Sequence, residues 1–206
     1  MNNNTKEILD LLNKHYPEAK TSLHYYTPFQ FLVAVILSAR STDEQVNRIT
    51  PALFAAFENP ADMAGADVQE VEQLIKSCGL YRTKSRNLVK MAGIIVDKYG
   101  GSIPSTIDEL TSLPGVGRKT ANVVRSNIFG QPAIAVDTHV FRVSKRLGLA
   151  SGKTPLHVEK ELMNIIPRQL WSGTHHRLIA HGRSICIRKP RCENCFLHCF
   201  CARKGV

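Results

Sequence analysis

The sequence lacks the features of a membrane or exported protein. Its longest apolar run, residues 31–37, is far too short to cross a bilayer. The first residues, MNNNTKEILD, do not combine a basic region with an apolar core, as an export signal does. We therefore expect a cytoplasmic protein with no membrane association.

Acidic residues are scarce relative to basic ones. The 206 residues include 27 Lys and Arg against 17 Asp and Glu, which gives a formal net charge of +10 that is spread along the chain. Such an excess favours a polyanionic partner. Many basic proteins bind no nucleic acid, however, so charge alone leaves both interpretations open.

Cysteine is nearly absent from most of the chain. Cys78 is followed only by a cluster of five cysteines in the C-terminal tail. In a chain without an export signal, this clustering indicates metal ligation more than disulfide formation. The cluster consists of Cys186, Cys192, Cys195, Cys199 and Cys201.

Convincing strand patterns are missing too. The only β-branched alternation, residues 133–136, is brief enough for an extended link, so the predicted fold is all-α. The segment FLVAVILSA is apolar on every side and predicts a fully buried central helix, with Thr27 as its cap and Gln30 reaching back in a capping box. Residues 79–84 are expected to form a loop with an apolar tip. Periodicity predicts helices over 5–16, 28–39, 43–57, 85–99 and 105–113, and others that begin near 60, 68, 118, 138 and 155, before a last one through 175–181.

The stretch from Leu113 to Asp137 carries the strongest functional signal. Two glycines in LPGVG let the backbone turn with its N–H groups exposed, and a helix follows at about Arg118. Lys119 then falls in the first turn, where the helix dipole and Arg118 disfavour a second positive charge and favour a neutral, nucleophilic amine. Asp137 begins another helix, where its carboxylate is stabilised as the anion. Each feature also has an ordinary explanation. The glycine turn could simply join two packed helices, Lys119 could be a surface charge, and Asp137 could be only a helix cap.

Three motifs together resemble a known family. LPGVGRKTANVV, then AVDTHVFRV and HGRSIC, with the cysteine tail after them, are similar to the endonuclease III family of DNA glycosylase/lyases over nearly the whole chain. The resemblance implies two helical domains with a DNA-binding cleft between them. One is a six-helix domain over residues 22–132, whose helix-hairpin-helix motif covers about 106–129. The other combines 1–21 with 133–206 and carries the cysteine cluster at 186–201.

The resemblance also implies an activity. The chain would remove oxidised pyrimidines from duplex DNA in base excision repair and cleave the abasic site by β-elimination. Lys119 would form the Schiff base and Asp137 would be the essential carboxylate, acting on a nucleotide flipped out of the stack. The implied partner is double-stranded DNA with damaged bases or abasic sites, which would make the protein nucleoid-associated, and we expect a monomer.

Further DNA contacts follow from the hairpin and from the family pattern. We expect the duplex to meet the hairpin at Gly115, Val116, Gly117 and Arg118. By resemblance, Leu80 wedges into the duplex and Arg40 fills the vacated space, although glutamine is common in the family at that position. Without the resemblance, Leu80 is better explained as a packed loop residue. Basic residues of the tail, Arg188, Lys189 and Arg191, are expected to meet phosphates.

The cysteine spacing departs from the family pattern. The family has six residues between its first two cysteines, whereas Cys186 and Cys192 enclose only five. A 4Fe-4S cluster held by Cys186, Cys192, Cys195 and Cys201 is the preferred interpretation. A structural zinc site is the alternative, and Cys199 could replace Cys201 if the shorter loop shifts the geometry.

Two other functions remain possible at this point. One is a glycosylase of the same fold for another lesion, such as mismatched adenine or thymine, which the lysine at 119 disfavours. The other is a non-catalytic DNA-binding module that uses the hairpin and the basic surface only for structure.

Overall fold

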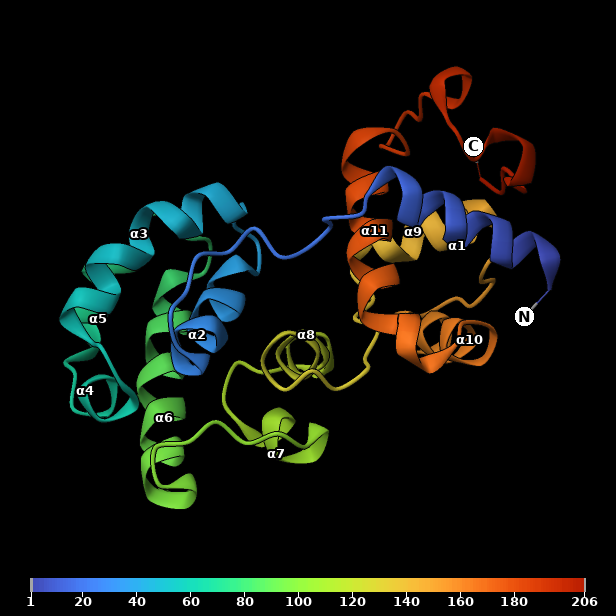
Figure 1. The fold of residues 1–206 in the computed structure, drawn as a ribbon. Helices are drawn as coiled ribbons and strands as arrows, with labels where there is room; N and C mark the ends of the chain where they lie inside the picture. Colours follow the sequence, from blue (N-terminus) through green and yellow to red (C-terminus); the bar gives the residue numbers. More distant parts are fainter. Residues whose placement is uncertain (1, 206) are drawn as a thin grey trace. The chain divides into compact units, whose positions relative to one another are not determined.

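The computed structural model describes residues 2–205. In that range the chain forms eleven α-helices and three short 3-10 helices, η1 to η3, without any β-strand, and this confirms the all-α prediction (Figure 1). Residues 133–136 are an extended link, as expected. None of the helices in residues 2–205 is both long and apolar enough to span a membrane.

The chain divides into two compact units, each with its own apolar core. The hairpin unit is Ser22–Gly130, and the cysteine unit comprises Met1–Thr21 and Gln131–Val206. The boundary predicted after residue 132 falls in the extended link that follows Gly130.

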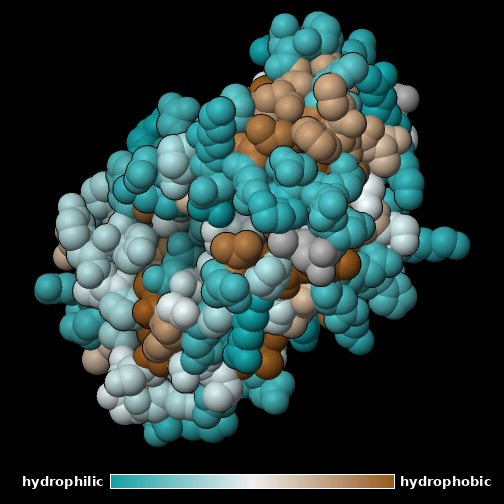
Figure 2. Space-filling model, turned by 45° about the vertical axis from the view of Figure 1, so that its right-hand side comes forward, coloured by the Kyte–Doolittle hydropathy of each residue, from teal (hydrophilic) through white to brown (hydrophobic). Residues whose placement is uncertain are grey.

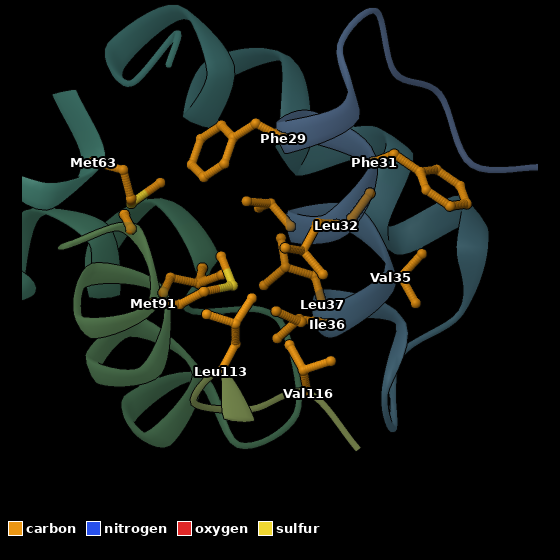
Figure 3. Packing of buried hydrophobic residues seen from close by; sticks show 14 of the residues in the cluster. Phe29, Phe31, Leu32, Val35, Ile36, Leu37, Met63, Met91, Leu113 and Val116 are labelled. Carbon is orange, nitrogen blue, oxygen red and sulfur yellow. The ribbon is translucent and has the colours of Figure 1, made fainter. Parts of the chain in front are cut away.

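The hairpin unit is built around α2 (Pro28–Ser38), whose residues from Phe29 to Leu37 are all buried (Figure 3). The Thr27 side chain accepts a hydrogen bond from the N–H of Gln30, as predicted for the cap. The Gln30 side chain, however, accepts from the N–H of Tyr26, one residue before the cap, so the predicted reciprocal capping box is wrong. The other helices of the unit are α3 (Asp43–Ala56), α4 (Pro60–Ala64), α5 (Val68–Ile75), α6 (Tyr81–Tyr99), α7 (Ile107–Ser112) and α8 (Arg118–Ile128).

The start of α6 differs from the prediction. The sequence suggested a loop over 79–84 with a helix from Ser85, but the helix begins at Tyr81. Leu80 occupies the preceding position in the left-handed conformation, with φ 60°, and turns the chain directly into the helix without a side-chain cap. Lys84 therefore lies inside the first turns of α6, and it is buried.

The cysteine unit packs α1 (Asn3–His15) and α9 (Thr138–Leu147) with α11 (Trp171–Ser184), and α10 (Pro155–Ile165) completes it (Figure 1). The Tyr16 hydroxyl, just after α1, is hydrogen-bonded to Ser184 at the end of α11 at 2.7 Å. The tail beyond α11 contributes Leu197 to the same core. Hydrophilic residues cover most of the face drawn in Figure 2, with smaller hydrophobic patches between them.

Candidate active site and metal centre

The hairpin between α7 and α8 is anchored by its apolar residues and exposes its glycines. Leu113 and Val116 belong to the core cluster that surrounds α2 (Figure 3). Gly115 has φ +82°, and a Cβ there would lie 3.3 Å from the Cβ of Asn87 on α6. This position therefore needs glycine both for its conformation and for its close approach to α6.

Val116, one of the residues expected to meet DNA, is buried in the hairpin. Its side chain is only 5% exposed, and its N–H donates to the carbonyl of Leu113 at 3.1 Å. Its apolar side chain lies between two exposed glycines and packs into the core of the hairpin unit, so Val116 anchors the hairpin.

The first turn of α8 is open to solvent. Gly117 is its N-cap and brings no side chain to the N–H groups of the first turn, whereas α7 is capped by the Thr106 hydroxyl. Gly117, Arg118 and Lys119 are all exposed. The helix thus presents the positive end of its dipole and the Lys119 amine on one surface of the hairpin unit.

Asp137 caps α9 in the cysteine unit. Its Oδ1 accepts hydrogen bonds from the N–H groups of His139 and Val140, both at 2.8 Å, and its Oδ2 lies 3.3 Å from the His139 Nδ1. The side chain is only 15% exposed. Two backbone donors at a helix N-terminus stabilise the ionised carboxylate, as the sequence indicated.

Arg40 and Leu80, here called the wedge pair, lie on two touching segments of the hairpin unit. Both are exposed and both have positive φ, 59° and 60°. The N–H of Gly79 donates to the Ser41 hydroxyl at 3.2 Å, and a Cβ on Gly79 would lie 2.8 Å from the Arg40 carbonyl oxygen. Only glycine permits this approach.

Lys84 is a residue that the sequence analysis missed. Its ammonium donates to the carbonyls of Leu37 and Ala39, at 2.7 and 2.6 Å, and lies 3.4 Å from the Ser41 hydroxyl. Burial lowers the pKa of Lys84 from its usual value, and the nearby Cys78 opposes that shift. The burial of Lys84 could have been predicted from helical spacing, since Lys84 precedes the buried Leu88 by one turn.

Four thiols of the cysteine unit line one pocket. The pocket also has an apolar wall, formed in part by Leu147 and Ile185, and Cys199 is exposed instead of lining it. Burial raises the pKa of the Cys195 and Cys201 thiols, so without a metal they favour the protonated form. The four thiols are those of Cys186, Cys192, Cys195 and Cys201.

Arginines of α9 hold the shortened loop between the first two of these cysteines. The buried Arg146 donates to the carbonyls of Ile187 and Arg188, at 2.6 and 3.1 Å, and lies 3.6 Å from the Cys186 sulfur. Arg142 donates to the Cys186 carbonyl at 3.1 Å. Neither arginine was predicted to be part of the site, because arginine on a helix is ordinarily a surface residue.

A histidine lies beside the same pocket. His181 Nε2 is 3.7 Å from the Cys195 sulfur, and burial, with the charge of His15, lowers the pKa of His181 to about 4. The imidazole is therefore neutral at physiological pH. The basic residues expected at DNA, Arg188, Lys189 and Arg191, are exposed on the loop around the pocket.

Comparison with known proteins places these features in one family. The family model of HhH-GPD superfamily base excision DNA repair proteins matches residues 33–168. Endonuclease III of Bacillus subtilis (strain 168) is 50% identical over 207 residues, covering 98% of the chain and 94% of the relative. Endonuclease III of Escherichia coli (strain K12) is 44% identical over 199 residues, covering 96% and 94%.

Solved structures agree with the sequence comparison. A trapped endonuclease III–DNA covalent intermediate superimposes with a TM-score of 0.93 at 48% identity, covering 98% of this chain and 97% of that one. A thermostable thymine-DNA glycosylase shares the fold with a TM-score of 0.87 at 24% identity, covering 97% and 96%. The fold is thus common to several glycosylases, and the family follows from the close relatives. The chain belongs to the endonuclease III family within the HhH-GPD superfamily of base excision DNA repair proteins.

Proposed function

We propose that Lys119 and Asp137 carry the chemistry of this member of the endonuclease III family. The chain is a bifunctional enzyme of base excision repair, a DNA glycosylase for oxidised pyrimidines and a lyase for abasic sites. The observation that supports the residue assignment is the exposed amine of Lys119 at the first turn of α8, a helix start without a side-chain cap.

The amine attacks C1′ of a flipped nucleotide as the bond to the base breaks, and the base leaves with a proton. The sugar ring opens to a Schiff base on Lys119, in which the C2′ proton is acidic. Loss of that proton breaks the bond to the 3′ phosphate, and water then releases the sugar from the lysine. Asp137, whose Oδ1 accepts from two backbone N–H groups, stabilises positive charge developing on the sugar and assists proton transfer.

Duplex DNA is the proposed partner. The two similar structures at 48% identity are a covalent and a non-covalent complex of endonuclease III with DNA. In this chain the exposed Gly115, Gly117 and Arg118 support a phosphate site at the hairpin, because backbone N–H groups and the helix dipole both favour an anion. The exposed arginines and lysine of the tail, at 188, 189 and 191, support further backbone contacts.

A 4Fe-4S cluster is the proposed occupant of the cysteine pocket. Four thiols share that pocket, yet among residues 2–205 no three Cys, His, Asp or Glu side chains are grouped to hold a single metal ion. A group wider than one ion fits this arrangement better than a tetrathiolate zinc site. The proposed ligands are the four cysteines lining the pocket. Bound there, the cluster would fix the tail and its basic residues.

The decisive assay follows a duplex that carries one thymine glycol. The wild-type protein should release the base and cut the strand by β-elimination, while Lys119→Gln should cut at the background rate. Lys90→Gln is the matched control, because Lys90 is an exposed lysine on α6 of the same unit. Strand cleavage by Lys119→Gln at the wild-type rate would overturn the assignment.

Two further outcomes would replace the function. Release of mismatched adenine or thymine in preference to thymine glycol would identify a glycosylase for another lesion. Binding of the damaged duplex without base release or strand cleavage would identify a non-catalytic module.

A further inference from the structure

We propose that Lys84 is a positioning residue, which holds Arg40 and Leu80 at a fixed separation so that both enter the duplex as one rigid element. This inference rests on the proposed function and on the expectation, from the family resemblance, that Leu80 wedges into the duplex while Arg40 fills the space left by the flipped nucleotide. Lys84 itself is buried and touches no substrate.

The backbone of the wedge pair is held in an unfavourable conformation. Among the described residues, only Arg40, Leu80 and Arg203 have positive φ without being glycine. Side chains with a Cβ rarely adopt this conformation, and it persists only where the surroundings impose it. Both exposed residues therefore need to be held by the structure around them.

Lys84 supplies that restraint from both of its ends. Its backbone N–H donates to the carbonyl of Leu80 at 3.0 Å, within the first turn of α6. Its side-chain ammonium donates to Leu37 and Ala39 and approaches Ser41, so its partners lie on both sides of Arg40 in the sequence. One residue thus connects the backbone of Leu80 to the segment that carries Arg40.

The ammonium is well suited to this place. The carbonyls of Leu37 and Ala39 lie at the C-terminal end of α2, where the helix dipole favours a cation. A buried charge is costly unless it is fully hydrogen-bonded, and an apolar side chain would fill the same space at less cost. A lysine at this position is therefore explained by the hydrogen bonds that its ammonium donates to the backbone carbonyls next to Arg40.

Other contacts keep the two segments together when Lys84 is changed. The Ser41 hydroxyl accepts from Gly79, and Gln45 is hydrogen-bonded to Ser77. The surrounding core of the hairpin unit is apolar and does not depend on the lysine. In Lys84→Met the new side chain has about the same length but donates no hydrogen bond. This variant should fold while leaving the wedge pair free to move.

The test compares cleavage of an abasic site in duplex and in single-stranded DNA. Duplex cleavage requires the wedge pair, whereas the single strand offers no stack to fill. Lys84→Met should lower duplex cleavage by about tenfold or more, because a mobile wedge pair stabilises the flipped state less well, and lower single-strand cleavage far less. Lys90→Met, with an exposed lysine on the same helix, should cut both at the wild-type rate.

A spectroscopic readout follows the wedge directly. With 2-aminopurine placed opposite a stable abasic analogue in a duplex, binding of the wild-type protein should raise the fluorescence as the orphaned base unstacks. Lys84→Met should lose most of that rise at saturating protein. Gly79→Ala, whose Cβ would collide with the Arg40 carbonyl, should give the same selective loss and serves as the second variant if Lys84→Met does not fold.

A triple variant separates the possible failures. Adding Lys84→Met to Arg40→Ala/Leu80→Ala should produce no further loss in the duplex assay. If the Arg40→Ala/Leu80→Ala protein behaves as the wild type, the wedge role is wrong and the positioning role falls with it. If that protein is impaired but Lys84→Met and Gly79→Ala are not, only the positioning role of Lys84 is overturned. Equal losses on duplex and single strand would also overturn it, because they indicate a general structural defect.

Discussion

The two units place their proposed catalytic groups in opposite surroundings. Lys119, in the hairpin unit, is an exposed amine at a helix start that no side chain caps. Asp137, in the cysteine unit, is itself the cap of its helix, and its carboxylate is largely buried on two backbone donors. A nucleophile needs freedom to reach C1′, whereas an electrostatic group works best when it is preorganised.

The cores of the two units also differ in composition. The hairpin unit closes around α2 with a large cluster of apolar side chains, so its shape follows mainly from packing. In the cysteine unit, the core reaches a pocket lined by thiols, with an arginine and a histidine beside it. The hairpin unit should therefore keep its structure without a metal, and the tail of the cysteine unit should not.

The largest expected effect tests the carboxylate. Asp137→Asn should lower the rate of base release by roughly 10²–10⁴-fold, because asparagine caps α9 equally well but carries no charge. Single-turnover kinetics on the thymine glycol duplex measure it. Asp67→Asn is the matched control, since Asp67 caps α5 in the hairpin unit through the N–H of Gln69. A fully active Asp137→Asn protein would show that residue 137 only caps α9 and that its charge plays no part in catalysis.

The second prediction separates the two units by their dependence on the tail. Cys195→Ser should lose nearly all of the brown absorption and of the bound iron, about four atoms per chain in the wild type. Trypsin should then cut the tail after Arg188 and Arg191 while the hairpin unit stays protected. Cys199→Ser, which changes the exposed cysteine, should match the wild type. A colourless wild-type preparation with stoichiometric zinc would contradict the cluster assignment.

The third prediction concerns a substitution in the apolar core of the hairpin unit. Leu32 is completely buried in α2, so Leu32→Ala should lower the free energy of unfolding of the hairpin unit by about 2–5 kcal/mol. Urea unfolding followed by circular dichroism measures the loss, and visible absorption reports the cluster in the same samples. Absorption that disappears together with the first loss of helix in Leu32→Ala would show that the two units do not differ as described.

The smallest expected effect concerns pH. Burial, with the charge of Arg177, lowers the pKa of His176 on α11 below its ordinary value of 6.5, so the folded protein holds this imidazole neutral. Below pH 6.5 the unfolded chain binds the additional proton, and the stability contributed by the neutral form is lost as pH falls through this range. The slope from one group is at most about 1.4 kcal/mol per pH unit. His176→Gln should flatten it in denaturant titrations at several pH values, and an unchanged slope would contradict the shift.

Much of the fold could be read from local patterns. The all-round apolar segment predicted the buried α2, and Thr27 and Asp137 were recognisable caps because each precedes a helical periodicity. The start of α6 could not be read in this way. Leu80, which precedes its first residue, adopts a left-handed conformation that local sequence does not predict, and no side chain caps the helix start.

The candidate sites were readable only in part. The residue types at 119 and 137 indicated chemistry from sequence, but the buried positions of Lys84 and Arg146 depend on tertiary partners that local spacing does not reveal. The tail shows the same limit. The spacing left Cys199 and Cys201 as alternatives, and the fold turns Cys201 toward the pocket while leaving Cys199 exposed.

The central claim is that Lys119 forms a covalent bond with the sugar. The most direct measurement is borohydride reduction of the native protein on an abasic duplex, followed by mass spectrometry of the crosslinked peptide. The account predicts one DNA adduct per chain, on the peptide containing Lys119, and no adduct with Lys119→Gln. An adduct on another residue, or a wild-type protein that cuts the duplex without being trapped, would contradict it.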